Sequence, residues 1–189
     1  MNIAVSYLDN LGIPRCGCPD LNLSAGNTKK WSINHLTYCV VGRDEDLDPE
    51  TWDEILRQAF DSWSKVTNLS FKQIDTQNSA NILIDVGSGP SSHFDGPLGT
   101  LAWAYLPPPG NYNGQLLMKF DTEELWATHG DQGTLLLNVA SHEIGHLLGL
   151  DHSSVDAALM APYYSASVSC PQDNDDIPRI QSLYGKKKC

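Results

Sequence analysis

The chain has 189 residues, enough for a single domain that buries its own hydrophobic core. Its formal net charge of -11 would repel phosphate, which argues against a nucleic-acid partner or an anionic membrane surface. No run of about eighteen apolar residues occurs, so we expect no membrane span. The acidic charge also suits an oxygen-ligated cation such as calcium, although the other interpretation, that it keeps the protein in solution, accounts for most of it. We expect a monomer.

Residues 1–30, called the leader below, differ in composition from the rest of the chain. Glycine and proline recur in the first part, and a polar stretch follows before Trp31. This composition predicts an irregular segment that ends in an exposed, cleavable linker. We therefore divide the chain into the leader, a folded domain over 31–185 and a short tail over 186–189.

The folded domain shows separate strand and helix patterns. Asp48 and Pro49 predict a helix start, and apolar residues follow at spacings of three and four up to Val66. A second helix is predicted from about Gly133 to Leu148, and a short last helix from about Asp175 to Gly185. Strands are predicted at 36–41, 69–74, 81–86, 101–106 and 116–121. Strands that come early, with helices set apart, predict an α+β domain.

Three histidines near the end of the second predicted helix form the most informative pattern. His142 and His146 are four residues apart, so they lie on one helical face and can bind one ion together. Gly149 ends the helix and permits the turn that brings His152 back as a third ligand. Three neutral imidazoles suit zinc and leave a fourth position for water. The sequence therefore predicts one zinc ion held by these histidines.

Glu143 directly follows the first histidine and supplies a carboxylate beside the predicted ion. Zinc lowers the pKa of a bound water toward ~7, and Glu143 would accept the proton of that water and deliver it to the leaving amine. This chemistry predicts a metalloendopeptidase with Glu143 as general base. The other interpretation is a catalytically silent module that binds zinc or peptides, and the presence of Glu143 argues against it.

The residues that follow the third histidine resemble those of the metzincin clan of metalloproteases. Met160 lies in the sequence Ala-Leu-Met-Ala-Pro-Tyr-Tyr and resembles the Met-turn, an apolar floor under the zinc. Ser153 stands directly after His152, as in the matrix metalloproteinases, or matrixins. The resemblance implies a secreted protease that acts on protein or peptide substrates. It also implies the metzincin type of α+β domain: a twisted, mostly parallel sheet, two long helices and a short C-terminal helix.

The leader contains a second motif of the same family. Residues 14–20 read Pro-Arg-Cys-Gly-Cys-Pro-Asp, which resembles the cysteine-switch motif of matrixins. With Cys16 as fourth zinc ligand the catalytic water would be excluded, so we expect a latent proenzyme with a propeptide remnant. The resemblance implies that Arg15 and Asp20 pair and hold this segment across the cleft. Two other interpretations are a disulfide at Cys16 and a different metzincin family, against which the length of the motif argues.

The resemblance also implies a calcium site and contacts to the substrate. Oxygen ligands of the kind that calcium requires would come from the side chains of Asp95, Asp121 and Glu124 and the backbone carbonyls of Gly96, Leu98 and Thr100. Ordinary surface carboxylates are the other interpretation of this set. An extended substrate would add to the edge strand of the sheet, and its predicted contacts are Leu101, Ala102, Pro162 and Tyr164. Asp175 and Asp176 resemble the acidic pair that meets the new N-terminus after activation.

The sequence departs from the matrixin pattern at the second, structural zinc site. Trp103 and Lys119 stand where histidines are expected, and the loop at 87–89 lacks the expected aspartate and histidine. We therefore expect a single, catalytic zinc. The four cysteines other than Cys16 allow three disulfide pairings, among which the sequence does not decide; these cysteines are Cys18, Cys39, Cys170 and Cys189.

Overall fold

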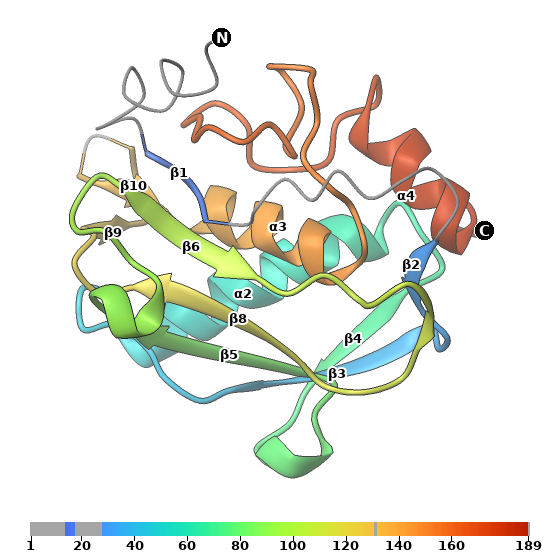
Figure 1. Cartoon of the computed structure of the whole chain (residues 1–189), viewed down its shortest axis with the longest axis horizontal. Coiled ribbons are helices and arrows are strands. Elements are labelled where there is room, and N and C mark those ends of the chain that lie inside the picture. The colour runs from blue at the N-terminus through green and yellow to red at the C-terminus, as the bar shows by residue number, and fades with distance from the viewer. Residues whose placement is uncertain (1–13, 18–27, 131, 189) are drawn as a thin grey trace, which may run out of the picture.

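A computed structural model describes residues 14–17, 28–130 and 132–188 of the chain. Its largest sheet has six strands in the order β1-β6-β8-β5-β3-β4 (Figure 1). These strands are β1 (Arg15–Cys16), β3 (His35–Val40), β4 (Ser70–Gln73), β5 (Ile82–Gly87), β6 (Thr100–Ala104) and β8 (Leu116–Asp121). Only β6 and β8 pair in antiparallel fashion. The predicted mostly parallel sheet is confirmed.

The helices of the described residues are α2 (Pro49–Ser64), α3 (Leu136–Leu147) and α4 (Asp176–Tyr184). Asp48 caps α2, because its Oδ1 accepts a hydrogen bond from the Thr51 amide at 2.9 Å. The two long helices pack against each other, and the Trp63 indole of α2 donates to the Ser141 carbonyl of α3 at 2.9 Å. Two long helices and a short C-terminal helix were expected, and this part of the fold is confirmed.

The second long helix begins later than its predicted start near residue 133. Thr134–Leu135 form strand β10, which pairs with β9 (Trp126–Ala127). The Thr134 amide donates to the Leu125 carbonyl at 2.8 Å, and the Leu135 amide donates to the Tyr164 hydroxyl at 3.0 Å. These partners hold the backbone extended up to Leu135, so the prediction was about three residues too early.

The described part of the leader is more regular than the predicted irregular segment. β1 joins the edge of the main sheet, and β2 (Lys29–Trp31) pairs with β7 (Gly110–Tyr112). The Lys29 side chain is buried, and its ammonium lies 2.7 Å from the carboxylate of Asp151. The expected boundary between residues 30 and 31 therefore falls inside a strand. Short 3-10 turns, η1 (Gln77–Ser79) and η2 (Pro90–Ser92), complete the set of elements.

The core lies where α2 and α3 pack on the sheet. Large side chains with almost no exposed surface fill it: Trp31, Trp52, Trp63, Trp126, Phe60 and Phe120. Helix α3, which carries His142 and His146, is itself deeply buried, and it contacts both β6 and β8. Among the described residues no helix combines the length and apolar character that crossing a membrane needs.

Candidate metal centre

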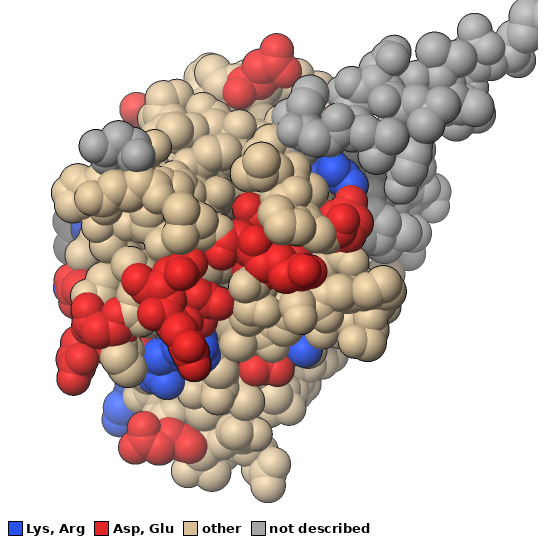
Figure 2. All heavy atoms as spheres, turned by 90° about the vertical axis from the view of Figure 1, so that its left-hand side faces the viewer, with Lys and Arg blue, Asp and Glu red and all other residues tan. Residues whose placement is uncertain are grey.

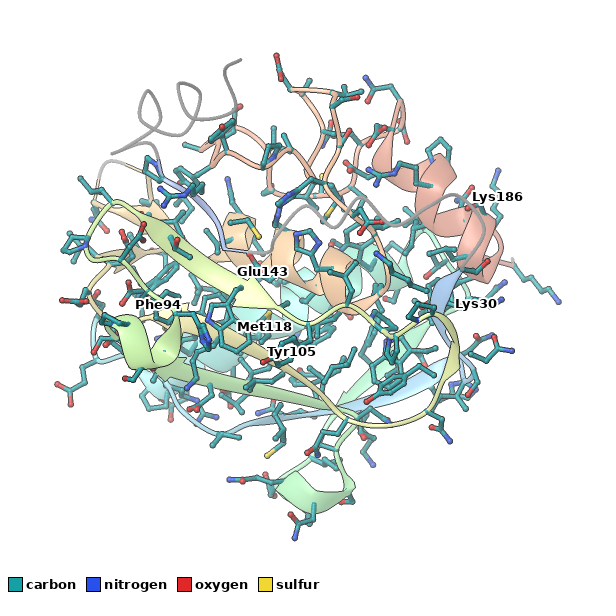
Figure 3. All side chains as sticks on the ribbon, in the orientation of Figure 1. Lys30, Phe94, Tyr105, Met118, Glu143 and Lys186 are labelled. Carbon is teal, nitrogen blue, oxygen red and sulfur yellow. The ribbon has the colours of Figure 1, made fainter. Side chains whose placement is uncertain are left out.

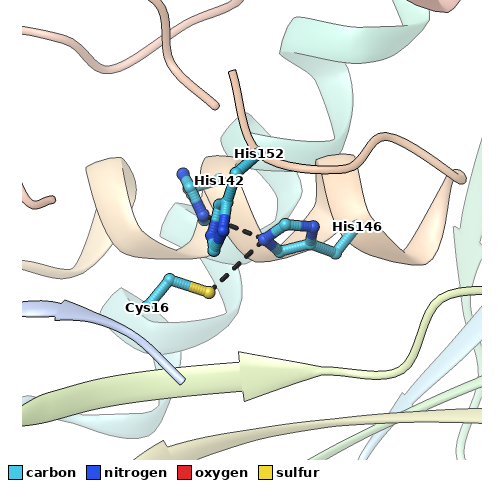
Figure 4. Close-up of side chains that lie close together, drawn as sticks. All are labelled: Cys16, His142, His146 and His152. Atoms are coloured by element: carbon cyan, nitrogen blue, oxygen red, sulfur yellow. Dashed lines mark hydrogen bonds between the residues drawn. The ribbon is translucent and has the colours of Figure 1, made fainter. Parts of the chain in front are cut away.

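The three predicted zinc ligands converge on one point beside α3 (Figure 4). His142 and His146 project from the same face of the helix, and their Nε2 atoms lie 3.1 Å apart. Gly149 follows the helix with φ of 101°, a conformation that favours glycine, and the chain then turns back to present His152. The Cys16 sulfur joins them, and the four ligand atoms all lie within 4.8 Å of one another. Within the described residues, this is the group that could hold a metal ion.

Backbone carbonyls fix the orientation of two of the histidine rings. His142 Nδ1 lies 2.7 Å from the Leu159 carbonyl oxygen, and His146 Nδ1 lies 2.7 Å from the Leu150 carbonyl oxygen. A carbonyl only accepts, so each Nδ1 carries the proton and each Nε2 presents a lone pair to the centre. Zinc requires neutral imidazoles with this tautomer, and the residues present therefore fit the ion.

Burial keeps these imidazoles in the neutral form that binds metal. It lowers the pKa of His142 to about 4, with a smaller opposing effect from the hydrogen bond with Leu159. The pKa of His146 is lowered well below its usual value by burial and then by the neighbouring histidines. Cys16 Sγ lies 3.3 Å from His146 Nε2, so the thiol lies beside the three histidines, where a fourth ligand of the predicted ion would bind.

Glu143 lies on α3, and Figure 3 marks it between this helix and β6. Its side chain is fully buried. Burial raises the pKa of Glu143 to about 8, and a hydrogen bond with Cys16 opposes this rise. The carboxyl group is therefore in contact with the thiol that lies at the metal centre, and its basicity is strengthened by its surroundings.

The leader segment is clamped between the edge strand and the chain that follows the third histidine. On one side, the Arg15 amide donates to the Gly99 carbonyl at 3.1 Å and the Gly17 amide donates to the Ala102 carbonyl at 2.8 Å. On the other side, the Cys16 amide donates to Pro162 at 3.1 Å, and the Tyr164 amide donates to Pro14 at 2.9 Å. Three predicted substrate contacts, Ala102, Pro162 and Tyr164, thus bind the leader backbone.

Arg15 forms an ion pair with Asp95 of the predicted calcium site. The expected partner, Asp20, lies outside the described residues. Burial alone would raise the pKa of Asp95, but hydrogen bonds from Thr100 and the charge of Arg15 outweigh it and lower that pKa. The leader therefore touches two predicted cation sites, one through Cys16 and one through Arg15.

Met160 is fully buried directly beneath α3. A Cβ atom at Gly145 would overlap the Met160 sulfur, so glycine between the two helical histidines permits this close approach. Asp176 of α4 fixes the backbone at Met160, because its carboxylate accepts hydrogen bonds from the amides of Leu159 at 2.8 Å and Met160 at 3.1 Å. Asp175 instead pairs with Arg179 at 3.0 Å. The supporting role of Asp176 was not predicted from the sequence.

A pocket lies beside the centre, between α3 and the segment that follows Met160. Leu101, another predicted substrate contact, lines it together with His142 and Glu143. Asn138 also lines the pocket, and the sequence analysis did not single it out. Asn138 precedes His142 by four residues, so a polar residue on the face of the ligands was the signal that could have revealed it.

The predicted calcium ligands form a second, acidic region, and Figure 2 shows acidic side chains gathered on one face of the molecule. Asp121 and Glu124 are buried, and Asp121 Oδ2 has no hydrogen-bond partner within the described residues. Burial raises the pKa of Asp121 and of Glu124, and the charge of Asp95 raises both further.

Backbone amides of the loop at 95–100 contact these carboxylates. Glu124 accepts a hydrogen bond from the Leu98 amide, and Asp95 accepts one from the Thr100 amide, each at 2.6 Å. Gly96 and Leu98 adopt positive φ values of 95° and 61° in this loop.

Trp103 and Lys119, which stand where matrixins have histidine ligands for a structural zinc, contact neighbouring side chains instead. Lys119 lies 3.4 Å from Asp85, and the Trp103 ring packs edge-on against His93 with a centroid distance of 5.7 Å. Cys39 is buried and Cys170 is exposed, and neither forms a disulfide. Cys18 and Cys189 lie outside the described residues.

The sequence was compared with protein-family models and with known proteins, and both comparisons point to the same family. A family model described as matrixin, Peptidase_M10, matches residues 30–185. The chain is 41% identical to the hatching enzyme of Paracentrotus lividus, 40% identical to stromelysin-1 of Mus musculus and 42% identical to karilysin of Tannerella forsythia. These alignments cover 93%, 91% and 82% of the chain, but 30%, 37% and 33% of the respective relatives. The chain thus spans about a third of the length of these relatives. Since the family model covers most of its residues, the chain belongs to the matrixin family of zinc metalloendopeptidases.

Proposed function

We propose that this chain is a secreted, monomeric zinc endopeptidase in a latent form, with Cys16 in the position that the catalytic water would take. The observation that carries this proposal is the convergence of the Cys16 sulfur with the ring nitrogens of His142, His146 and His152. Three histidines suit a catalytic zinc, whereas a fourth protein ligand is typical of a closed site. A closed site formed partly by the leader supports latency.

His142, His146 and His152 would hold the zinc ion and keep their lone pairs directed at it. When bound, zinc supplies Lewis-acid polarisation of a carbonyl and lowers the pKa of water. Glu143 would take a proton from the attacking water and deliver it to the amine of the leaving segment.

The leader would inhibit the enzyme in two ways. Its thiol excludes water from the centre, and its backbone takes the hydrogen-bonding groups at Gly99, Ala102 and Pro162. Those groups are suited to an extended protein or peptide substrate, which adds to a sheet edge in the same manner. We propose that residues 31–185 are the catalytic domain and that Met160 supports the centre from below. We also propose one calcium ion at the acidic region, with Asp95, Asp121 and Glu124 as side-chain ligands and Gly96, Leu98 and Thr100 as carbonyl ligands.

The test of latency is the Cys16→Ala variant of the full chain. We expect this variant to cleave a quenched-fluorescence peptide without proteolysis, whereas the wild-type chain becomes active only after limited proteolysis of the leader. Both proteins should carry one zinc per chain by metal analysis. Cys170→Ala is the matched control, because Cys170 is exposed and is not part of the ligand group, and it should stay latent. A Cys16→Ala protein that binds zinc and stays inactive after leader cleavage would support the silent zinc-binding module instead.

A further inference from the structure

The end of helix α3 is held by two elements that are distant from it in the sequence. The last carbonyl groups of any helix have no partner within the helix. Here the Trp31 indole of β2 donates to the Leu147 carbonyl at 2.7 Å, and the Tyr184 hydroxyl of α4 donates to the Leu148 carbonyl at 2.8 Å. The Trp31 amide also donates to the Tyr184 hydroxyl at 3.0 Å, so β2 and α4 lie side by side there (Figure 1). Both elements therefore fix the point at which the chain leaves the helix.

The backbone of β2 passes directly over the turn that follows α3. A Cβ atom at Gly149 would overlap the Lys29 carbonyl oxygen, so glycine permits this close approach as well as the positive φ. The Lys29 side chain contacts the next part of the same turn, where its ammonium lies 2.7 Å from Oδ1 of Asp151. Asp151 directly precedes His152 in the chain. Lys29 thus contacts the turn twice, once at each end.

Lys29 is the buried member of its ion pair. Its side chain is 6% exposed, whereas that of Asp151 is 49% exposed. A lysine is almost never buried to this extent without a charged partner, because its ammonium loses its hydration. The buried ammonium therefore keeps the Asp151 carboxylate in one place. In addition, the Arg179 guanidinium of α4 donates to the Asp151 carbonyl at 2.6 Å, which holds the backbone of the same residue.

The position of His152 depends on these contacts more than the positions of the other two histidines do. His142 and His146 lie on α3, so the regular helix sets their backbone positions. His152 lies beyond the helix, in a segment without regular secondary structure. Its backbone position is therefore set by the contacts that hold residues 149–152 against β2 and α4.

We propose that Lys29 is a positioning residue that holds His152 at the metal centre through its ion pair with Asp151. This role rests on the proposed binding of zinc by the three histidines. Residues that orient a metal ligand without binding the metal contribute about 10- to 100-fold to metal affinity. The catalytic domain then extends back at least to Lys29 instead of starting at residue 31. A cleavage of the leader that gives full activity would leave Lys29 attached to the domain.

The experiment measures the Kd for zinc by competition with a chromophoric chelator. It uses the full chain with Cys16→Ala, so that the leader thiol does not bind the ion. Lys29→Met should raise this Kd about tenfold or more, because methionine keeps an apolar stem but removes the ammonium. Asp151→Asn should raise the Kd by a similar factor. Lys119→Met is the matched control, because it breaks the Lys119–Asp85 ion pair of the main sheet, and it should leave the Kd unchanged.

A double mutant separates positioning through the ion pair from simple packing. Each single variant removes the same contact, so Lys29→Met should raise the Kd little further in the Asp151→Asn background. A Kd that rises by the same factor in both backgrounds, or in neither, would overturn the proposal. Thermal unfolding of the zinc-free proteins shows whether each variant folds. If Lys29→Met does not fold, Asp151→Asn decides alone, since Asp151 is half exposed, and an unchanged Kd would then overturn the proposal.

Peptide cleavage separates this proposal from the proposed endopeptidase function. If Cys16→Ala binds zinc with a Kd that responds to Lys29→Met but cleaves no peptide, the endopeptidase function fails and the role of Lys29 stands. If it cleaves peptide and its Kd does not respond to Lys29→Met, the endopeptidase function stands and the role of Lys29 fails. The role of Lys29 also fails if mass spectrometry finds that a fully active product of limited proteolysis begins at Trp31.

Discussion

The histidine centre is the group that could hold a metal ion, and the acidic region is the site proposed for calcium; burial affects the two in opposite ways. At the histidine centre, burial lowers the pKa values of His142 and His146 and keeps the ligands uncharged. At the acidic region, burial raises the pKa values of Asp121 and Glu124, and neighbouring carboxylates raise them further. Uncharged ligands tolerate the absence of an ion, whereas clustered carboxylates repel one another without one. We therefore expect the first region to govern catalysis and the second to govern stability.

The largest expected effect is loss of catalysis at the histidine centre. Replacing Glu143 by alanine should lower kcat/KM of the activated enzyme by roughly 10²- to 10⁴-fold, the usual contribution of a general base. Zinc content by metal analysis and the melting temperature should stay close to the wild type, because the three histidines remain. Glu123→Ala is the control, since Glu123 is exposed and adjoins the acidic region, where its amide donates to Asp121 Oδ1. A similar loss of activity in Glu123→Ala would contradict the expectation that the histidine centre governs catalysis and the acidic region governs stability.

The two regions also differ in how far the sequence predicts them. His142, His146 and His152 lie within one short segment, and helical periodicity with a glycine turn is enough to bring them together. The carboxylates of the acidic region come from different segments, so only the resemblance to matrixins predicted their grouping. The Arg15–Asp95 ion pair joins residues that are far apart in the sequence, and no local pattern indicates it.

Local sequence patterns predicted most helices and strands of the fold, but they failed where contacts between distant segments determine the backbone conformation. The amphipathic repeat and the Asp48 cap predicted α2 closely. The start of α3 was misplaced because the Tyr164 hydroxyl and β9 hold Leu135 in an extended conformation. The buried contacts of Asp176 to Leu159 and Met160 depend on how α4 docks, which periodicity does not describe.

Removal of calcium is expected to have the next largest effect, and to act on stability. A calcium-selective chelator should lower the melting temperature by roughly 5–10 °C, as expected for an ion present well above its Kd in a domain of this size. The reason is the repulsion among Asp95, Asp121 and Glu124 that the ion would neutralise. The measurement is thermal unfolding of the zinc-loaded protein with and without the chelator.

Asp121→Asn and Asp75→Asn form a matched pair for this measurement. Asp121 is buried in the acidic region, and Asp75 is an exposed carboxylate outside the set of predicted ligands. The chelator effect should shrink in Asp121→Asn and persist in Asp75→Asn. Equal chelator effects in the two variants would show that calcium stabilises the protein elsewhere.

A smaller effect is expected from pH. The folded-state pKa of Asp121 is raised by burial, so without calcium its ionised form destabilises the fold, and protonation as the pH falls through this raised pKa removes this loss. Calcium-free wild type should therefore gain stability relative to Asp121→Asn on acidification, by roughly 1–3 °C in melting temperature. With calcium bound the ionised form is favoured, and the trend should reverse. The same slope with and without calcium would mean that Asp121 does not face the ion.

The smallest expected effect concerns the contact that joins the two regions through the leader. The side chains of Arg15 and Asp95 are 25% and 43% exposed, and such ion pairs contribute about 0.2–1 kcal/mol. Arg15→Ala in the full chain should therefore raise the alkylation rate of the Cys16 thiol by at most about fivefold, measured on the Cys16 peptide by mass spectrometry. Arg57→Ala, which breaks exposed ion pairs on α2, is the control and should change nothing. If Arg15→Ala released the protease as fully as Cys16→Ala, the acidic region would hold the leader as strongly as the histidine centre does. Its role would then extend from stability to latency.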